Sequence, residues 1–306
     1  MPRLLITGAN GHLGRRLIQA LPASVSIQAV VRSVRAQAML EKHAGTRENL
    51  TITLCDPSDA QALTALAMGC DAAVHLLGMI KETRTNHYAD AHQRPALALA
   101  QAARLSGLKH IVYLSILGTN ATSHCRCLQA RAAVEDILQQ APAAVTVIRV
   151  PMVLGEGDRA SGALIRRARQ RHVFLFRGAS LEQPIYAGDV IDAMRAALHD
   201  TAANRLLELA GPESLPRAAL LARAAALMQS TPSIHSLPLS LGLALAGVLA
   251  GCRANPPLTP DMLRVLDHDD ALDPAPAAAA LGLTLTPLDV MLERCIKHRL
   301  PQAATR

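Results

Sequence analysis

The sequence predicts an α/β protein with a doubly wound parallel sheet and a smaller α+β lobe toward the C-terminus. Short apolar runs alternate with helix-like segments over the first half of the chain, which is typical of parallel βαβ units. The runs are apolar almost throughout, as expected for strands that helices cover on both faces. With 306 residues and roughly 100–200 residues per domain, the chain is long enough for two domains.

The first half contains six expected strands and five expected helices. The strands cover residues 3–7, 26–31, 50–55, 71–77, 110–115 and 144–150. The helices cover residues 13–21, 35–43, 58–68, 88–106 and 128–140. Ser58 is the expected cap of the third helix and Gly107 closes the fourth, since serine favours helix starts and glycine favours helix ends.

The alternation loosens after Pro151. The expected elements there are helices at 161–171, 216–228 and 261–266 and strands at 173–176 and 205–209. We therefore expect one domain at 1–155 and a smaller lobe at 156–306, with a crossing of the chain between them near 172–200.

Charge and aromatic content limit the classes of partner. The chain has 31 basic and 24 acidic residues, hence a net charge of +7, but it has no Trp, three Tyr and two Phe. Binding of nucleic acid by base stacking is therefore not expected. Four arginines, at 166, 167, 169 and 171, are interpreted as a solvated helix face.

Cysteine usage and hydropathy bear on location. The six cysteines show no CxxC pattern, and an apolar strand at 3–7 leaves no room for a secretory leader, so we expect a cytoplasmic protein. The apolar run 237–251 has 15 residues, fewer than the ~20 that a membrane span needs. It either packs on its own core or forms an apolar docking surface, peripheral to the inner membrane or to a protein complex.

The most specific motif is TGANGHLGR at 7–15, which lies between the first strand and the first helix. Its glycines allow a tight turn, close approach of a pyrophosphate and close packing of helix on strand, and the helix N-terminus offers free N–H groups. This context predicts a Rossmann dinucleotide site at 1–155. The candidate phosphate-binding residues are Gly8, Asn10, Gly11, His12, Leu13 and Gly14.

The end of the second strand bears on which dinucleotide binds. An NAD enzyme is expected to carry Asp or Glu there, to accept a hydrogen bond from the ribose 2′-hydroxyl. This chain has Val31, Arg32 and Ser33, with Arg35 nearby. Because arginine pairs with a 2′-phosphate, Arg32 favours NADP(H) over NAD(H).

The GxxGxxG spacing resembles the short-chain dehydrogenase/reductase superfamily, in its extended and atypical branches. The resemblance implies that Asp56 contacts adenine, that Leu76, Leu77 and Gly78 run beside the cofactor, and that Ser115 stands where the family has its catalytic serine. RVPMVLGEGD at 149–158 looks like the family segment that borders the nicotinamide. The residues implied there are Pro151, Met152 and Val153.

The superfamily's usual chemistry needs a Tyr–x–x–x–Lys pair, in which the ammonium lowers the tyrosine pKa. The lysines are at 42, 81, 109 and 297, and none follows a tyrosine by four residues. The resemblance places the pair at Cys127 and Arg131. Arg131 is then expected to hold a ribose or a phosphate, and Cys127 to be an inert, partly buried thiol. A metal site at His124, Cys125 and Cys127 is a weak alternative.

The segment 89–118, the lobe segment 207–228 and NPPLTPDMLRVL at 255–266 look more narrowly like atypical members related to the NADPH-binding accessory subunit of respiratory complex I. That resemblance implies a firmly bound NADPH and weak or no standard oxidoreductase activity, with an electron-transport accessory or redox-sensing role. The rival hypothesis is an active NADP-dependent reductase or nucleotide-sugar epimerase/dehydratase. In that case Ser115 polarises the substrate and His124 or Tyr186 serves as the acid.

Overall fold

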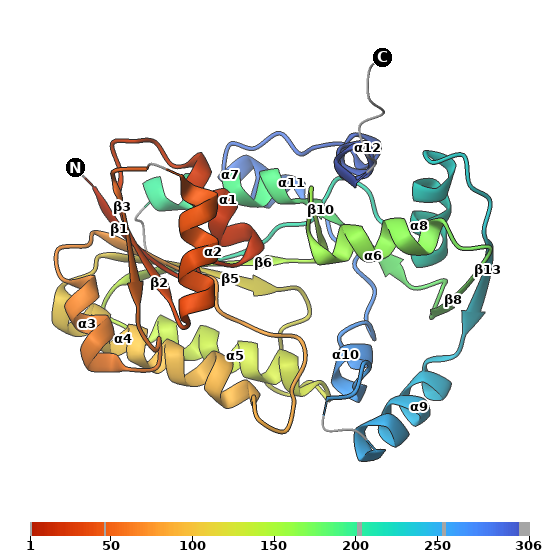
Figure 1. The fold of residues 1–306 in the computed structure, drawn as a ribbon, viewed down its shortest axis with the longest axis horizontal. Coiled ribbons are helices and arrows are strands. Elements are labelled where there is room, and N and C mark those ends of the chain that lie inside the picture. The colour runs from red at the N-terminus through yellow and green to blue at the C-terminus, as the bar shows by residue number, and fades with distance from the viewer. Residues whose placement is uncertain (1, 46, 201–203, 253–254, 300–306) are drawn as a thin grey trace. The chain divides into compact units, whose positions relative to one another are not determined.

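The computed structural model describes residues 2–45, 47–200, 204–252 and 255–299, and they fall into two compact units (Figure 1). The first unit comprises Met1–Arg149 and Ile191–Leu207, and the second comprises Val150–Val190 and Glu208–Arg306. The chain thus leaves the first unit after Arg149, returns at Ile191 and leaves again after Leu207.

A seven-stranded sheet, in the order β11-β6-β5-β4-β1-β2-β3, forms the centre of the first unit. Its strands are β1 (Arg3–Thr7), β2 (Ser26–Val31), β3 (Leu50–Leu54), β4 (Ala72–His75), β5 (His110–Ile116), β6 (Ala144–Val150) and β11 (Arg205–Glu208). β1 pairs in parallel with β2 and with β4, while β2–β3 and β4–β5 are also parallel. The strand order reverses between β1 and β4, and ligands of such sheets bind at the carboxyl ends beside that switch point.

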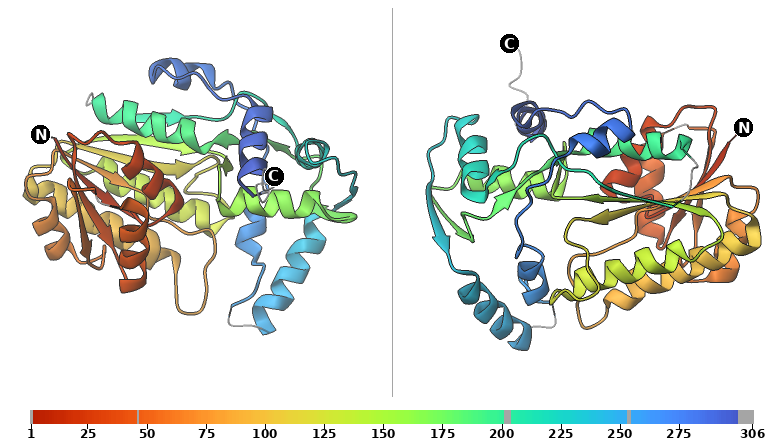
Figure 2. Two further views of the ribbon diagram at one scale, coloured as in Figure 1. Left: turned by 45° about the horizontal axis from the view of Figure 1, so that its top comes forward. Right: turned by 180° about the vertical axis from the view of Figure 1, so that it is seen from behind.

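Helices cover both faces of this sheet, which confirms the doubly wound α/β prediction. They are α1 (His12–Ala20), α2 (Val34–Ala44), α3 (Ala60–Ala67), α4 (Arg94–Ser106) and α5 (Arg126–Gln139). α1 and α2 lie on one face and α3, α4 and α5 on the other, as Figure 1 and the rear view in Figure 2 show. The core between the sheet and the second group contains fully buried Leu5, Leu99, Ile111, Tyr113 and Leu138.

Three local details differ from the expectations, although the strand expected at 205–209 is present. The cap of α3 is Asp59, whose carboxylate accepts from the Gln61 and Ala62 amides at 3.0 Å, and not Ser58. The expected helix 88–106 begins with a π-helical turn, η1 (Ala89–Gln93), before α4. The strand predicted at 205–209 is β11 on the edge of the main sheet, because an edge strand carries few signs of the sheet it joins.

The second unit mixes short strands with helices around its own core. Its strands are β7 (Val153–Leu154), β8 (His172–Phe176), β9 (Leu181–Glu182), β10 (Ile185–Tyr186), β12 (Leu215–Pro216) and β13 (Ser233–Leu237). Its helices are α6 (Arg159–Ala168), α8 (Arg217–Ala226), α9 (Leu239–Cys252), α10 (Pro260–Arg264), α11 (Ala275–Ala280) and α12 (Leu288–Arg299). α7 (Ala187–His199) begins in this unit and continues into the first. The core gathers Leu154, Ile165, Leu220, Met291 and Ile296.

The apolar run noted in the sequence forms α9, and little of this helix is buried. Only Gly242 and Ala246 are buried along it, whereas Leu241, Leu245 and Val248 are exposed. Across the described part of the chain, no helix combines the length and the hydropathy that a bilayer crossing requires.

Candidate functional site: the glycine loop and its pocket

The loop after β1 requires glycine at the positions that the motif predicts. Gly8 has a φ of +75°, and a Cβ there would lie 2.9 Å from the backbone carbon of Leu76. A Cβ at Gly14 would lie 2.6 Å from the carbonyl oxygen of Ala9. Side chains at either position would therefore push α1 and the end of β4 away from the loop, as expected where helix and strand pack closely.

The N-terminus of α1 opens at Gly11, which is exposed and whose amide donates to the Gly8 carbonyl at 3.0 Å. Within the described chain, no side chain caps this helix. The first-turn N–H groups and the positive end of the helix dipole are therefore available to an anion, which is the physical basis of phosphate binding at such sites.

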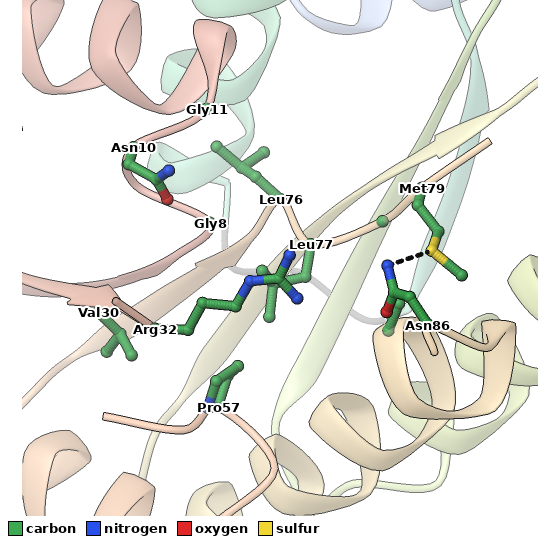
Figure 3. A pocket seen from close by; sticks show the side chains of 12 residues that line it. Gly8, Asn10, Gly11, Val30, Arg32, Pro57, Leu76, Leu77, Met79 and Asn86 are labelled. Atoms are coloured by element: carbon green, nitrogen blue, oxygen red, sulfur yellow. Dashed lines mark hydrogen bonds between the residues drawn. The ribbon is translucent and has the colours of Figure 1, made fainter. Parts of the chain in front are cut away.

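A pocket of about 200 Å³ lies beside this loop (Figure 3). It is lined by Gly8, Asn10, Gly11, Val30, Arg32, Pro57, Leu76, Leu77, Gly78, Met79, Asn86 and Ala91. The lining comes from the ends of β1 and β2 and from the segments that follow β3 and β4. The structure therefore brings together seven of the predicted residues: Gly8, Asn10, Gly11, Arg32, Leu76, Leu77 and Gly78.

Arg32 extends from the end of β2 toward Leu77 across the pocket (Figure 3). Its side chain is exposed, and within the described residues it forms no ion pair. The next residue, Ser33, caps α2 by accepting from the Ala36 amide at 3.2 Å. No carboxylate therefore stands at the end of β2, where an acceptor for a ribose hydroxyl is expected in NAD-binding proteins.

The other predicted cofactor residues lie outside the pocket lining. His12, Leu13 and Gly14 belong to the first turn of α1, and His12 accepts from Nε of Arg16 at 3.0 Å. Asp56 is exposed and accepts from the Ser58 amide at 2.9 Å, while the adjacent Pro57 lines the pocket instead.

Pro151, Met152 and Val153 belong to the second unit, where the Met152 carbonyl accepts from the Ile185 amide at 3.0 Å. Their predicted role beside the nicotinamide stays a prediction.

A buried polar layer underlies the strand ends next to the loop. Thr7 Oγ1 and His75 Nδ1 are 2.8 Å apart, and the His75 and Tyr113 rings lie 5.6 Å apart, centroid to centroid. Burial lowers the pKa of His75 to about 3, with smaller contributions from His92 and Arg131. Burial also raises the pKa of Tyr113. His75 and Tyr113 are therefore both neutral at pH 7.

Ser115 is held by a buried ion pair. Its hydroxyl donates to Glu135 at 2.6 Å, and Arg149 Nη2 donates to the other carboxylate oxygen of Glu135, also at 2.6 Å. Ser115 is completely buried and Glu135 nearly so. The Ser115 hydroxyl thus already donates a hydrogen bond within the chain, and it does not line the pocket. Its catalytic role stays a prediction.

Cys127 and Arg131 lie one turn apart on α5, behind the segment that follows β4. Cys127 is fully buried, and its Sγ donates to the Met79 carbonyl at 3.4 Å. Arg131 donates from Nη1 to the Leu114 carbonyl at 3.3 Å. A Cβ at Gly78 would lie 2.7 Å from Nη2 of Arg131, so this glycine allows the guanidinium to approach the pocket wall.

His92, on η1, completes this wall. Its Nε2 accepts from the Met79 amide at 3.1 Å, and the ring is fully buried. Burial and the neighbouring charge of Arg131 lower the pKa of His92 to about 4. Among the described residues, Nδ1 of His92 and Nε of Arg131 are buried without a hydrogen-bond partner.

The two candidate acids of the rival hypothesis, His124 and Tyr186, lie outside the pocket lining. His124 is exposed before α5. Tyr186 belongs to the second unit, where its hydroxyl donates to Glu156 at 2.6 Å; burial is the main cause that raises its pKa. In the part of the chain that the structure describes, no three His, Cys, Asp or Glu side chains gather closely enough to hold a metal ion.

Sequence reasoning missed two groups of residues. Val30, Pro57, Met79, Asn86 and Ala91 line the pocket, but all except Val30 lie on irregular segments or the π turn, whose paths the sequence does not reveal. Asn86 donates to the sulfur of Met79 at 3.0 Å (Figure 3). The buried layer of His75, Tyr113 and Glu135 was also missed. Its signal was a titratable side chain inside an apolar run, as in DAAVHLL at 71–77.

The sheet order, the glycine loop and the pocket at the switch point together define a dinucleotide-binding protein of the Rossmann class. Residues 8–199 match the NAD(P)H-binding family. Because this match covers more than half of the chain, the protein belongs to that family.

Curated relatives extend the similarity. The chain is 28% identical over 249 residues to the mitochondrial NADH dehydrogenase (ubiquinone) 1 alpha subcomplex subunit 9 of Arabidopsis thaliana. The aligned region covers 79% of this chain and 61% of the relative. It is 30% identical over 169 residues to a ceramide reductase of Caulobacter vibrioides, or 55% of this chain and 51% of the relative. The chain thus spans less than two thirds of either relative. The predicted resemblance to the complex I accessory subunit is confirmed.

Solved structures share the fold. An NADPH-dependent quinone oxidoreductase of Escherichia coli in complex with NADPH superposes with a TM-score of 0.73 at 19% identity, over 96% of this chain and 99% of that one. A UDP-glucuronic acid 4-epimerase of Bacillus cereus in complex with UDP-glucuronic acid and NAD gives 0.73 at 16% identity, over 97% and 98%. The predicted short-chain dehydrogenase-like, epimerase-like architecture is confirmed.

Proposed function

We propose that this chain binds NADP(H) on its glycine loop and has weak or no standard oxidoreductase activity, so that the bound dinucleotide serves an accessory or redox-sensing role. The observation that carries the proposal is the burial of Cys127, the residue that the family resemblance predicts in place of the superfamily's tyrosine. The thiol is fully buried and donates to the Met79 carbonyl, so it cannot reach a substrate.

The residues around the pocket fit a dinucleotide. Gly8 and Gly11 leave room for a diphosphate at the uncapped start of α1, and a Cβ at Gly8 would close the turn against Leu76. Asn10 and the segment from Leu76 to Gly78 complete the wall. The dinucleotide, when bound, supplies a nicotinamide that exchanges hydride. The chain's own part is to bind and orient it, because His75 and His92 are neutral at pH 7 and offer no acidic proton.

NADP(H) is proposed over NAD(H) because Arg32 lines the pocket without an ion pair among the described residues, and Arg35 is exposed nearby. We expect Arg32→Gln to weaken NADPH binding about tenfold, the usual scale for one charge-assisted hydrogen bond to a phosphate. NADH binding should change little. Titration of nicotinamide fluorescence measures both, with Arg104→Gln, an exposed arginine of α4, as the matched control. Equal weakening of NADPH and NADH would overturn the assignment.

Turnover tests the absence of standard activity. The purified chain is assayed with NADPH against aldehydes, ketones, quinones and a nucleotide sugar, alongside Cys127→Ala. We expect rates near background for both proteins and equal NADPH affinities. Turnover that is lost in Cys127→Ala, while NADPH still binds, would show that the thiol takes part in catalysis and would sink the proposal.

The rival function is an active reductase or epimerase/dehydratase with a non-standard acid. In it, Ser115 polarises the substrate and either His124, which is exposed before α5, or Tyr186 serves as the acid. It draws on similarity to proteins named ceramide reductase and quinone oxidoreductase. In the same assay it predicts turnover that Cys127→Ala leaves unchanged and that His124→Gln or Tyr186→Phe abolishes.

We extend the proposal to location: the chain resides in the cytoplasm, peripheral to the inner membrane or to a protein complex. All six cysteines are free thiols, as is usual in reducing compartments. The Arabidopsis relative is a subunit of an NADH dehydrogenase. Co-fractionation of the tagged chain with washed membranes, released by high salt, tests this placement; recovery entirely in the soluble fraction at low salt would contradict it.

A further inference from the structure

The exposed side of α9 forms an apolar surface that the second unit leaves uncovered. Leu241, Leu245 and Val248 are 53%, 50% and 65% exposed, and their spacing of four and three residues puts them on one face of the helix. Gly242, on another side, packs on Phe176 of β8, because a Cβ there would lie 2.8 Å from the ring. The helix is thus attached by its small residues and presents its large ones outward.

This surface continues onto β8. Phe174 is 59% exposed, and it lies on the same face of the strand as Phe176 because side chains alternate along a strand. The Phe174 ring stacks on His235 of β13 at 5.1 Å, and β13 leads directly into α9. We call Phe174, Leu241, Leu245 and Val248 the α9 patch. Figures 1 and 2 show β8, β13 and α9 in succession at one edge of their unit.

Positive charge stands at the other end of β8. Arg166, Arg167, Arg169 and Arg171 are all exposed at the end of α6 and in the turn before β8. None of these four arginines forms an ion pair within the described chain. Neither 159–181 nor 214–260 contains an Asp or a Glu, so no carboxylate of these two segments neutralises the cluster. The α9 patch and the four arginines thus lie at opposite ends of β8, and no ion pair within the described chain neutralises the arginines.

We propose that the α9 patch and the four arginines dock on the surface of a bilayer that contains anionic lipid, with α9 lying in the plane of the interface. Apolar side chains enter the boundary between headgroups and acyl chains, while arginines contact headgroup phosphates. Charge complementarity favours a lipid surface: among the residues that the structure describes, the four arginines form no ion pair, and α9 has no charged residue with which to orient a protein partner. This proposal is independent of the dinucleotide.

Vesicle co-sedimentation of the full chain tests it, with vesicles of phosphatidylcholine alone and of phosphatidylcholine mixed with phosphatidylglycerol. We expect binding to the mixed vesicles, weak binding to the neutral ones, and release by salt because exposed charges are screened. Changing all four arginines to Gln should weaken binding to the mixed vesicles at least about tenfold, given the contribution of each basic residue near an anionic surface.

Leu241→Gln/Leu245→Gln should weaken vesicle binding about tenfold, since two half-exposed leucines lose their apolar contact. The matched control is Leu97→Gln/Leu105→Gln, two leucines of α4 that are 56% and 59% exposed, and it should bind like the unaltered chain. Circular dichroism and urea unfolding check that each variant is folded. Failure to bind mixed vesicles, or equal loss in the control pair, would overturn the proposal. A capacity to bind vesicles without NADPH affinity would leave it standing and refute only the proposed function.

Discussion

The loop that lines the pocket and the buried layer behind it, on the side of α5, differ in how their polar groups are used. On the loop side, within the part of the chain that the structure describes, no side chain caps the α1 N-terminus and Arg32 forms no ion pair. On the α5 side, Ser115 donates to Glu135 and Cys127 donates to Met79. The loop side has donors and charge available to a ligand, whereas the hydroxyl and the thiol on the α5 side already form hydrogen bonds within the chain. The resemblance predicts Ser115 and Cys127 at catalytic positions, but in the structure their hydrogen bonds are made within the fold.

The largest effect is expected on the α5 side. Glu135→Gln leaves Arg149 without its carboxylate partner in a nearly buried site, and breaking such a pair costs about 3–5 kcal/mol of unfolding free energy. Urea unfolding measures the loss. The double variant Glu135→Leu/Arg149→Met removes both charges and should recover most of the stability. A single variant as stable as the unaltered chain would show that Ser115 and Glu135 are not structural.

Gly14→Ala probes the loop side. The added Cβ would meet the carbonyl oxygens of Ala9 and Gly8 at 2.6 and 2.7 Å, and such overpacking costs about 1–3 kcal/mol. NADPH binding should be lost as well, because the loop must shift. Gly247→Ala is the control: nothing lies within 4 Å of its Cβ, and alanine stabilises a helix interior by up to about 1 kcal/mol. Unchanged NADPH affinity in Gly14→Ala would break the comparison.

The buried histidines make the unfolding free energy depend on pH. Burial depresses the pKa of His75 to about 3 and that of His92 to about 4, below the ordinary value near 6.5. Between pH 6.5 and about 4 the unfolded chain therefore binds protons that the folded chain does not, so stability falls as pH falls. Each histidine should remove about 2 kcal/mol between pH 7 and pH 5.

His75→Gln should reduce this loss of stability by about half, as measured by urea unfolding at both pH values. His124→Gln alters an exposed histidine and should leave the pH dependence unchanged. An unaltered dependence in His75→Gln would mean that His75 takes up its proton in the folded chain at the same pH as in the unfolded chain, and the strand ends beside the loop would then hold a usable acid.

The strands of the central sheet could be predicted well because each is recognisable from a short stretch of sequence. β1, β2 and β6 have the predicted bounds, since each is a largely apolar run between polar turns. α7 and α12 were not predicted; α12 could have been, because Thr286, Pro287 and Asp289 form a helix-start signal in the sequence. The glycine loop was predicted for the same local reason as the strands: its three glycines are a short-range requirement of one turn.

The wall of the pocket shows where local information ends. Met79 and Asn86 reach the pocket through an irregular segment, and Glu135 meets Arg149 across 14 residues of sequence. Such pairings depend on which strands become neighbours, and that is decided by burial over the whole unit. His75 could have been noticed as a titratable residue inside a strand, but its neighbours Thr7 and Tyr113 could not.

The π turn η1 has a consequence for how this chain can vary. A π turn holds one more residue than the α-helical turn it replaces, and here it sets His92 against Met79 while α4 keeps Leu99 and Ala103 in the core. Deleting a single residue from Ala89–Gln93 would restore regular winding and would rotate one of these two sets out of place. We therefore expect a length change within that turn to cost the hydrogen bond between His92 and Met79.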